Sequence, residues 1–101
     1  MIDLDLNSLQ RIKIILKKHV PGVEVRAFGS RVSGGAKKFS DVDLVIIGNT
    51  PVPNKVMNEL RFEFSNSDLP IMVDIIDWHK ITKEFQEKIQ STSEVFISSK
   101  S

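Results

Sequence analysis

Residues 29–47 read GSRVSGGAKKFSDVDLVII and lead from a glycine-serine turn, through a glycine-rich segment, into an almost wholly apolar run. Two aspartates, Asp41 and Asp43, stand where the apolar run begins. A short apolar run bounded by turn residues is typical of a strand that is covered on both faces. We therefore expect a central strand over residues 42–47, with two carboxylates at its beginning and a tight turn ahead of the segment that leads to it.

On either side of this segment, helical and extended patterns alternate along the chain. The predicted elements, in order, are a helix over 8–19, a half-exposed strand over 23–28, a short helix around 30–35, the central strand, a helix that starts at 53–54, a strand over 71–76, a helix after residue 77 and a short edge strand over 95–97. Asn7 and Asp77 are the predicted N-caps of the first and last helices. Asn7 is followed three residues later by Gln10, as in a capping box. This alternation indicates one α/β domain over residues 1–101, in which helices flank a small sheet.

The composition excludes several classes of protein. The chain carries 14 basic and 13 acidic residues, so its overall charge gives no reason to expect nucleic acid or an anionic membrane as a partner. It has no cysteine, which excludes disulfides and thiolate zinc sites and agrees with a reducing, cytoplasmic location. It shows no basic leader and no apolar run near the roughly 20 residues of a membrane span, so we expect no signal peptide or membrane anchor. His19 and His79 lie outside any cluster with metal-ligand spacing and are predicted to be surface residues.

Asp41 and Asp43 are candidate metal ligands. Because side chains alternate along a strand, residues two apart project from the same face. Two carboxylates this close repel each other unless a positive charge lies between them. Mg²⁺ takes oxygen ligands and is commonly shared between carboxylates and the phosphates of a substrate. The pair therefore suits a magnesium-bound nucleoside triphosphate, although Asp-x-Asp alone more often marks a solvated strand end or turn.

Gly29, Ser30 and Arg31 are candidates for binding the triphosphate. Gly29 would let the backbone approach the phosphates closely. Ser30 offers a hydroxyl and an N–H group at a helix start, where anions bind. Arg31 could neutralise phosphate charge, and it could equally be an ordinary surface residue. A glycine after a strand is usually just a turn, so the significance of these residues depends on the acids that follow them.

Asp74 is a third candidate, because it interrupts the apolar run 71–76. A run of this kind is expected to be buried, and an unpaired buried carboxylate costs several kcal/mol. Asp74 therefore needs a partner, which would be a salt bridge to Arg26 or Arg31, or a bound metal. In the functional interpretation, Asp74 is a metal ligand and the general base that deprotonates an attacking hydroxyl.

Taken together, these residues resemble the nucleotidyltransferase superfamily that includes DNA polymerase beta, and more closely the minimal nucleotidyltransferase (MNT) domains of prokaryotes. The resemblance rests on the Gly29-Ser30 pair, the Asp41-Val42-Asp43 motif ten residues later and the strand carboxylate Asp74, and it covers nearly the whole chain. It implies a mixed sheet flanked by helices, ATP as the nucleotide donor and Mg²⁺ as the metal. It also implies that the three aspartates bind metal and that the glycine and serine bind the triphosphate.

Many minimal nucleotidyltransferase domains are paired with a small helical HEPN protein, an RNase toxin. The resemblance implies that this chain is the antitoxin, which would transfer AMP from ATP to a tyrosine of the toxin and form a complex with it. The chain itself contains no tyrosine, so a tyrosine acceptor would have to belong to another protein. Two other interpretations stay open: a nucleotide-binding or steric-blocking module with little turnover, and a nucleotidyltransferase subunit that acts on a small molecule.

Overall fold

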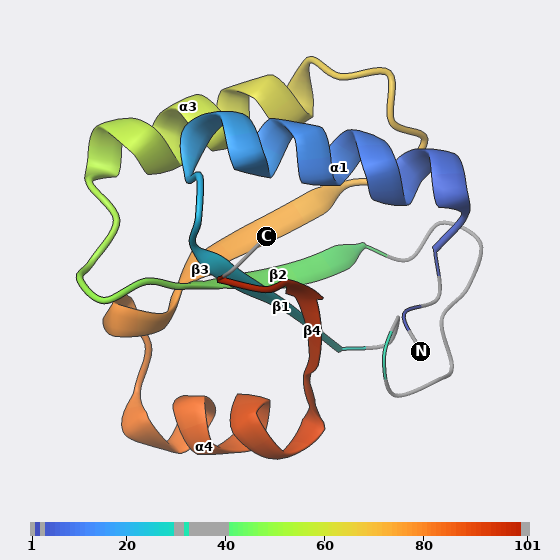
Figure 1. Cartoon of the computed structure of the whole chain (residues 1–101). Helices are drawn as coiled ribbons and strands as arrows, with labels where there is room; N and C mark the ends of the chain where they lie inside the picture. The colour runs from blue at the N-terminus through green and yellow to red at the C-terminus, as the bar shows by residue number, and fades with distance from the viewer. Residues whose placement is uncertain (1, 3, 30–31, 33–40, 100–101) are drawn as a thin grey trace.

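A computed structural model describes residues 2, 4–29, 32 and 41–99 of the chain. The elements, shown in Figure 1, are helix α1 (Leu6–His19), strand β1 (Glu24–Phe28), strand β2 (Val42–Ile47), helix α3 (Asn54–Ser65), strand β3 (Val73–Asp77), a 3₁₀ helix η1 (Trp78–Lys80), helix α4 (Lys83–Thr92) and strand β4 (Glu94–Ile97). The predicted strands are all present: β2 has the predicted bounds, and the bounds of the other three shift by one or two residues. The predicted short helix around 30–35 lies outside the described residues, apart from Val32.

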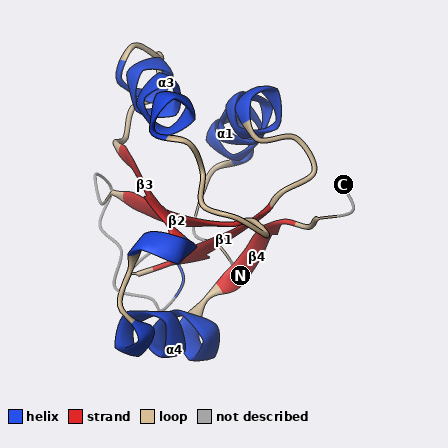
Figure 2. Ribbon diagram, turned by 90° about the vertical axis from the view of Figure 1, so that its left-hand side faces the viewer, coloured by secondary structure: helices blue, strands red, loops and turns tan. Residues whose placement is uncertain are grey.

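The four strands form one mixed sheet in the order β3-β2-β1-β4. Strand β2 runs parallel to β3 and antiparallel to β1, and β1 runs antiparallel to β4. Figure 2 shows α1 and α3 side by side on one face of the sheet and α4 on the other. The predicted α/β architecture, a small mixed sheet flanked by helices, is therefore confirmed. Within the described residues, no helix is long and apolar enough to cross a membrane.

Strand β2 forms the centre of the core, as the apolar run predicts. Val42, Leu44 and Ile46 are fully buried and belong to the cluster that packs under α1 and α3. Val45 is also fully buried, and the alternation along the strand turns it to the face that carries α4. Full burial on both faces follows from the position of β2, which has a strand on each side and helices above and below.

The cap of α1 differs from the prediction. Asp5, and not Asn7, is the N-cap, and the backbone N–H of Ser8 donates to Asp5 Oδ2 at 3.0 Å. The helix begins two residues earlier than the apolar spacing indicated, so the predicted capping box between Asn7 and Gln10 is wrong. An aspartate that accepts from the third residue after it satisfies one of the free N–H groups of the first turn.

Asp77 is a cap, but of a different element from the one predicted. Its Oδ1 accepts from the N–H of His79 at 3.0 Å, which caps η1, whereas α4 is capped by Thr82. Its Oδ2 accepts from the N–H of Val52 at 2.7 Å. The carboxylate is buried, and it joins the end of β3 to the loop that leads into α3. The 3₁₀ turn was not foreseen because its three residues carry no periodic apolar pattern.

Candidate functional site

Asp43 on β2 and Asp74 on β3 occupy opposite positions in the parallel ladder. Residues that face each other in register project from the same face of a sheet, so the two carboxylates are neighbours. Asp43 shares this face with Phe28, its antiparallel partner on β1, and the ring of Phe28 packs on α4. The acids therefore stand at the beginnings of two adjacent strands, on the face that carries α4 and away from α1 and α3. The structure brings Asp43 and Asp74 together as expected.

The exposure of Asp74 corrects the prediction that it is buried. Asp74 and Asp41 are exposed and Asp43 is half-buried. Strand β3 is an edge strand, and its neighbour Met72 is 73% exposed. Helix α4 contacts β1, where the ring of Phe85 packs on that of Phe28. The cost of an unpaired buried charge consequently does not apply to Asp74, and its importance rests on its position beside Asp43.

A salt bridge between Asp74 and Arg26 was one alternative to a metal. Arg26 is instead paired along its own strand, with its Nε 2.5 Å from Glu24 Oε2. The other candidate partner, Arg31, lies outside the described residues. The ion pair between Arg26 and Glu24 leaves the carboxylates of Asp43 and Asp74 beside each other without Arg26 between them.

The electrostatics of Asp43 reflect this crowding. Partial burial raises the pKa of the Asp43 carboxyl, and the nearby charges of Asp74 and Asp41 raise that pKa further. A raised carboxyl pKa means that the folded protein gains from any positive charge placed among these groups. The donors are carboxylate oxygens, which fit Mg²⁺ better than a softer metal. Within the described residues, no three acidic or histidine side chains converge closely enough to hold an ion by themselves. Mg²⁺ completes its ligand shell with water and substrate phosphates, so a site for it does not require three side chains that have already converged.

Gly29 brings the turn after β1 up against Asp43. Its φ is +81°, in the region that favours glycine, and a Cβ placed on it would lie 2.5 Å from Asp43 Oδ2. The N–H of Val32 donates to the carbonyl of Gly29 at 3.1 Å, which closes a turn there. The predicted turn is thus in contact with the predicted acids. Ser30 and Arg31, the other predicted triphosphate ligands, lie outside the described residues.

The family described as "Polymerase beta, Nucleotidyltransferase" matches residues 10–101. This chain belongs to that nucleotidyltransferase family. It is 44% identical, over 89 residues, to the probable protein adenylyltransferase MntA of Haemophilus influenzae, and the match covers 88% of this chain and 78% of the relative.

Solved structures of toxin–antitoxin complexes and of a minimal nucleotidyltransferase contain chains with the same fold as this chain. One is a toxin–antitoxin complex with AMP-PNP, with a TM-score of 0.75 and 20% identity over 89% of this chain and 73% of that one. A second is the MNT antitoxin in complex with the tri-AMPylated HEPN toxin of Shewanella oneidensis, with a TM-score of 0.68 and 17% identity over 91% and 71% of the two chains. A third is a minimal nucleotidyltransferase, with a TM-score of 0.68 and 23% identity over 90% and 95%.

In this nucleotidyltransferase an aromatic pair flanks the acids, a feature that sequence reasoning missed. The rings of Phe28 and Phe85 meet edge to face, with their centroids 5.7 Å apart. Phe28 lies opposite Asp43 in the ladder, and Phe85 is partly exposed on α4. The alternation of residues 24–28 could have placed Phe28 on the Asp43 face, but only the structure shows that α4 meets it there. The pair forms an apolar boundary on the β1 side of the carboxylates.

The two histidines are far from the acids, and only one of them is a surface residue as predicted. His79 is exposed, and its Nε2 lies 2.7 Å from the carbonyl oxygen of Gly48. The side chain of His19 is only 13% exposed, because α3 covers it. Its Nε2 lies 2.7 Å from Glu63 Oε1, and its Nδ1 lies 3.8 Å from Glu59 Oε2. His19 therefore joins α1 to α3 on the other side of the sheet and takes no part in this site.

Proposed function

We propose that this chain is an antitoxin that transfers AMP from ATP to a hydroxyl group of a HEPN toxin, most simply a tyrosine, in a complex with that toxin. The observation that carries the proposal is the paired position of Asp43 and Asp74, directly beside the turn at Gly29. The similarity to a probable protein adenylyltransferase and to toxin–antitoxin complexes supports the choice of donor and partner. A steric-blocking module without turnover would not need a second carboxylate beside Asp43.

In the proposed mechanism Asp41, Asp43 and Asp74 are the metal-binding carboxylates. Mg²⁺ bound there would neutralise the crowded charges and polarise the triphosphate of ATP. The turn at Gly29 brings the backbone up to this position, and Ser30 and Arg31 are proposed to bind the phosphates that extend from it. The metal is thus assigned to a group of carboxylates in which partial burial, and then the charges of Asp74 and Asp41, raise the pKa of Asp43.

Asp74 is proposed to be the general base as well. It accepts the proton of the acceptor hydroxyl as the hydroxyl oxygen bonds to the α-phosphorus of ATP. The bond between the α-phosphorus and the bridging oxygen breaks, and pyrophosphate leaves. The exposure of Asp74 on an edge strand suits this role, because a hydroxyl that belongs to another protein must be able to reach it.

Two observations support a protein, and not a small molecule, as the acceptor. The chain contains no tyrosine, so a tyrosine acceptor must come from another molecule. Within the part of the chain that the structure describes, the acids lie on an open part of the sheet face, since both Asp41 and Asp74 are exposed. An open site admits the chain of a macromolecular acceptor more readily than it encloses a small molecule.

The experiment is to incubate the purified protein with Mg²⁺ and ATP labelled at the α-phosphate, in lysate from its own host. A double variant, Asp41→Asn with Asp43→Asn, is the matched control. The proposal predicts one small labelled protein, which mass spectrometry identifies as a HEPN toxin carrying AMP, and no such band with the variant. Label confined to small molecules would instead support the small-molecule enzyme, and the absence of label with intact MgATP binding would support the binding module.

A further inference from the structure

Met72, the residue before β3, is the most exposed large apolar side chain in the described part of the chain, at 73%. The N–H of Val42 donates to its carbonyl at 2.9 Å, next to the ladder pair of Val42 and Val73. Asp41 and Met72 precede this pair, so they lie next to each other at the start of two strands. Single exposed apolar side chains are common on protein surfaces, so the position of Met72 beside the acids is more informative than its exposure.

The alternation at the start of β3 places the side chain of Met72 on the same face of the sheet as that of Asp74. Ile71 and Val73 pack against the core under α1 and α3, and Ile75 is buried in that core. Met72 and Asp74 alternate with these residues, and both are exposed. Because side chains alternate between the two faces of a strand, both project from the α4 face, with Cα atoms roughly 7 Å apart.

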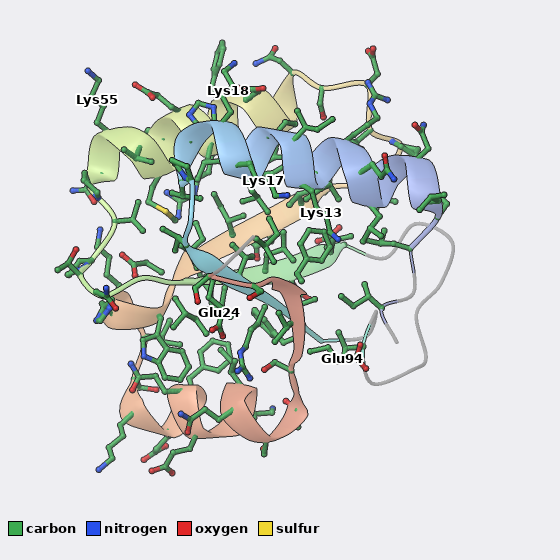
Figure 3. The ribbon with its side chains drawn as sticks, viewed as in Figure 1. Lys13, Lys17, Lys18, Glu24, Lys55 and Glu94 are labelled. Atoms are coloured by element: carbon green, nitrogen blue, oxygen red, sulfur yellow. The ribbon has the colours of Figure 1, made fainter. Side chains whose placement is uncertain are left out.

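On the β1 side of the acids, the side chains of this face already have partners within the described residues. The ring of Phe28 packs edge to face on that of Phe85. Farther along β1, Glu24 pairs with Arg26 under α4, and Figure 3 shows Glu24 on the side of the sheet that carries α4. The largely exposed apolar side chain beside the acids is therefore on the β3 side, at Met72.

The order of the strands indicates which substrate Met72 meets. Gly29 follows β1, Asp43 is on β2 and Asp74 is on β3, so these three residues follow one another across the sheet. In an in-line displacement, the attacking oxygen and the leaving group lie on opposite sides of the phosphorus. The triphosphate is proposed to bind beside Gly29, so the acceptor hydroxyl approaches from the Asp74 side. Met72 lies on that side.

We propose that Met72 binds the aromatic ring of a tyrosine acceptor while the hydroxyl of that tyrosine reaches Asp74. The spacing of the two residues along β3 is comparable to the length of a tyrosine side chain, so a ring with its hydroxyl at Asp74 extends over Met72. Methionine is flexible, and its sulfur makes favourable contacts with aromatic rings at about 5 Å. The proposal rests on the proposed function for the existence of a hydroxyl acceptor. It adds a residue that favours tyrosine over serine or threonine, whose short side chains do not reach Met72 from the same hydroxyl position.

The test records the methyl signals of methionine in the full-length protein, labelled with ¹³C at the methyl groups. The chain has three methionines, and the variant Met72→Leu assigns the Met72 signal by its loss. Met57 is 3% exposed and is an internal control. The sample contains Mg²⁺ and α,β-methylene ATP, in which the bond that breaks during transfer is replaced by one that does not. N-acetyltyrosine amide is titrated, in parallel with N-acetylleucine amide and N-acetylserine amide.

The tyrosine compound should move the methyl signal of Met72 upfield, because a ring that stacks on a methyl group shields it. The signal of Met57 should stay in place. The leucine and serine compounds have no ring, so neither should produce the upfield shift at the same concentration. A merely structural role of Met72 would not produce this selective response.

Two variants connect this contact to transfer. Met72→Ala should raise the KM for the acceptor protein at least about threefold, more than it lowers kcat, and it should leave MgATP binding unchanged. Val95→Ala is the matched control, because Val95 is 50% exposed but lies on β4, at the other edge of the sheet. Both variants change exposed side chains, so both should fold, and Val95→Ala should transfer AMP like the unmodified protein.

Several results would overturn the proposal. One is a Met72 signal that does not move at tens of millimolar of the tyrosine compound, or that moves equally with the leucine compound. Another is an upfield shift caused by α,β-methylene ATP alone, with no further response to the tyrosine compound, because the nucleobase would then occupy Met72.

Failure of this proposal is distinguishable from failure of the proposed function. If the Met72 signal responds to the tyrosine compound but no protein accepts AMP, the ring-binding site stands and the transfer to a toxin does not. If a protein accepts AMP and Met72→Ala transfers like the unmodified protein, the transfer stands and Met72 is not its acceptor contact.

Discussion

The backbone of Gly29 stands directly against the carboxylate of Asp43. A Cβ at residue 29 would lie 2.5 Å from Asp43 Oδ2, and the φ of +81° disfavours any residue with a side chain at the same position. Glycine is therefore required for two independent reasons, its backbone conformation and the space that the acid occupies. This contact couples the turn after β1 to the carboxylate at the start of β2.

Gly29→Ala should consequently cost more than the backbone conformation alone. Gly22→Ala is the matched control, because Gly22 has a φ of +73° but a Cβ there would meet nothing within 4 Å. We expect Gly22→Ala to lower the free energy of unfolding by about 1 kcal/mol. Gly29→Ala should lower it by about 2–4 kcal/mol, since a steric clash adds to the same strain. Urea unfolding measures both, and equal losses would show that the contact with Asp43 is not a constraint.

Asp43→Asn should remove nucleotide transfer without unfolding the protein. The amide cannot replace a charged metal ligand, and we expect a loss of at least about 100-fold in the rate of transfer. The melting temperature should stay equal or rise, because the substitution removes the repulsion with Asp74 and Asp41. The check is a labelled-ATP assay beside a thermal scan. A variant that transfers AMP at the original rate would remove Asp43 from the metal site.

Asp74→Asn should separate chemistry from binding. As the proposed general base, Asp74 should contribute about 10²–10⁴-fold to the rate, while MgATP binding should weaken much less. Single-turnover transfer and nucleotide titration on the same sample measure the two effects. Asp68→Asn, a change at a side chain that is 93% exposed, serves as the control. If Asp74→Asn abolished MgATP binding altogether, its role would be that of a metal ligand alone.

Asp43 should contribute to the pH dependence of the free energy of unfolding. Its pKa is raised above the ordinary value of 3.8, so the folded state holds the proton more tightly than the unfolded state does. The free energy of unfolding therefore falls as the pH rises from about 3.8 through the raised pKa, and levels off above it. In the Asp43→Asn variant this fall should be absent. The free energy of unfolding of the variant, relative to that of the unmodified protein, should therefore rise with pH over this range. A difference that stays constant, or that changes in the other direction, would contradict the raised pKa.

Asp77→Asn should destabilise the fold and spare the chemistry. The buried carboxylate accepts from Val52 and His79, and an amide would present a donor to one of those two N–H groups. We expect a loss of about 1–3 kcal/mol. Asp77 lies on the opposite face of the sheet from Asp74, so transfer per folded molecule should be unchanged. A large loss of activity at full stability would place Asp77 in the functional site.

Features of the fold that depend on a single segment could be predicted from the sequence, whereas features that depend on contacts between distant segments could not. The apolar run 42–47 predicted the central strand because burial on both faces leaves a continuous pattern. The alternation along β2 and β3 could not show that Asp43 and Asp74 pair, because register is a relation between two strands. The burial predicted for Asp74 was wrong for a similar reason: an apolar run does not reveal that its strand lies at the edge of the sheet. The burial of His19 likewise depended on α3, which lies more than 30 residues away in the chain.

The most direct measurement of the central claim compares two positions of the label. The protein is incubated with Mg²⁺ and host lysate, in parallel reactions with ATP labelled at the α-phosphate or at the γ-phosphate. Transfer of AMP at the Asp43–Asp74 site predicts one labelled acceptor protein with the α label, none with the γ label, and none with Asp43→Asn. Labelling from the γ-phosphate, or α labelling that survives in Asp43→Asn, would contradict the account.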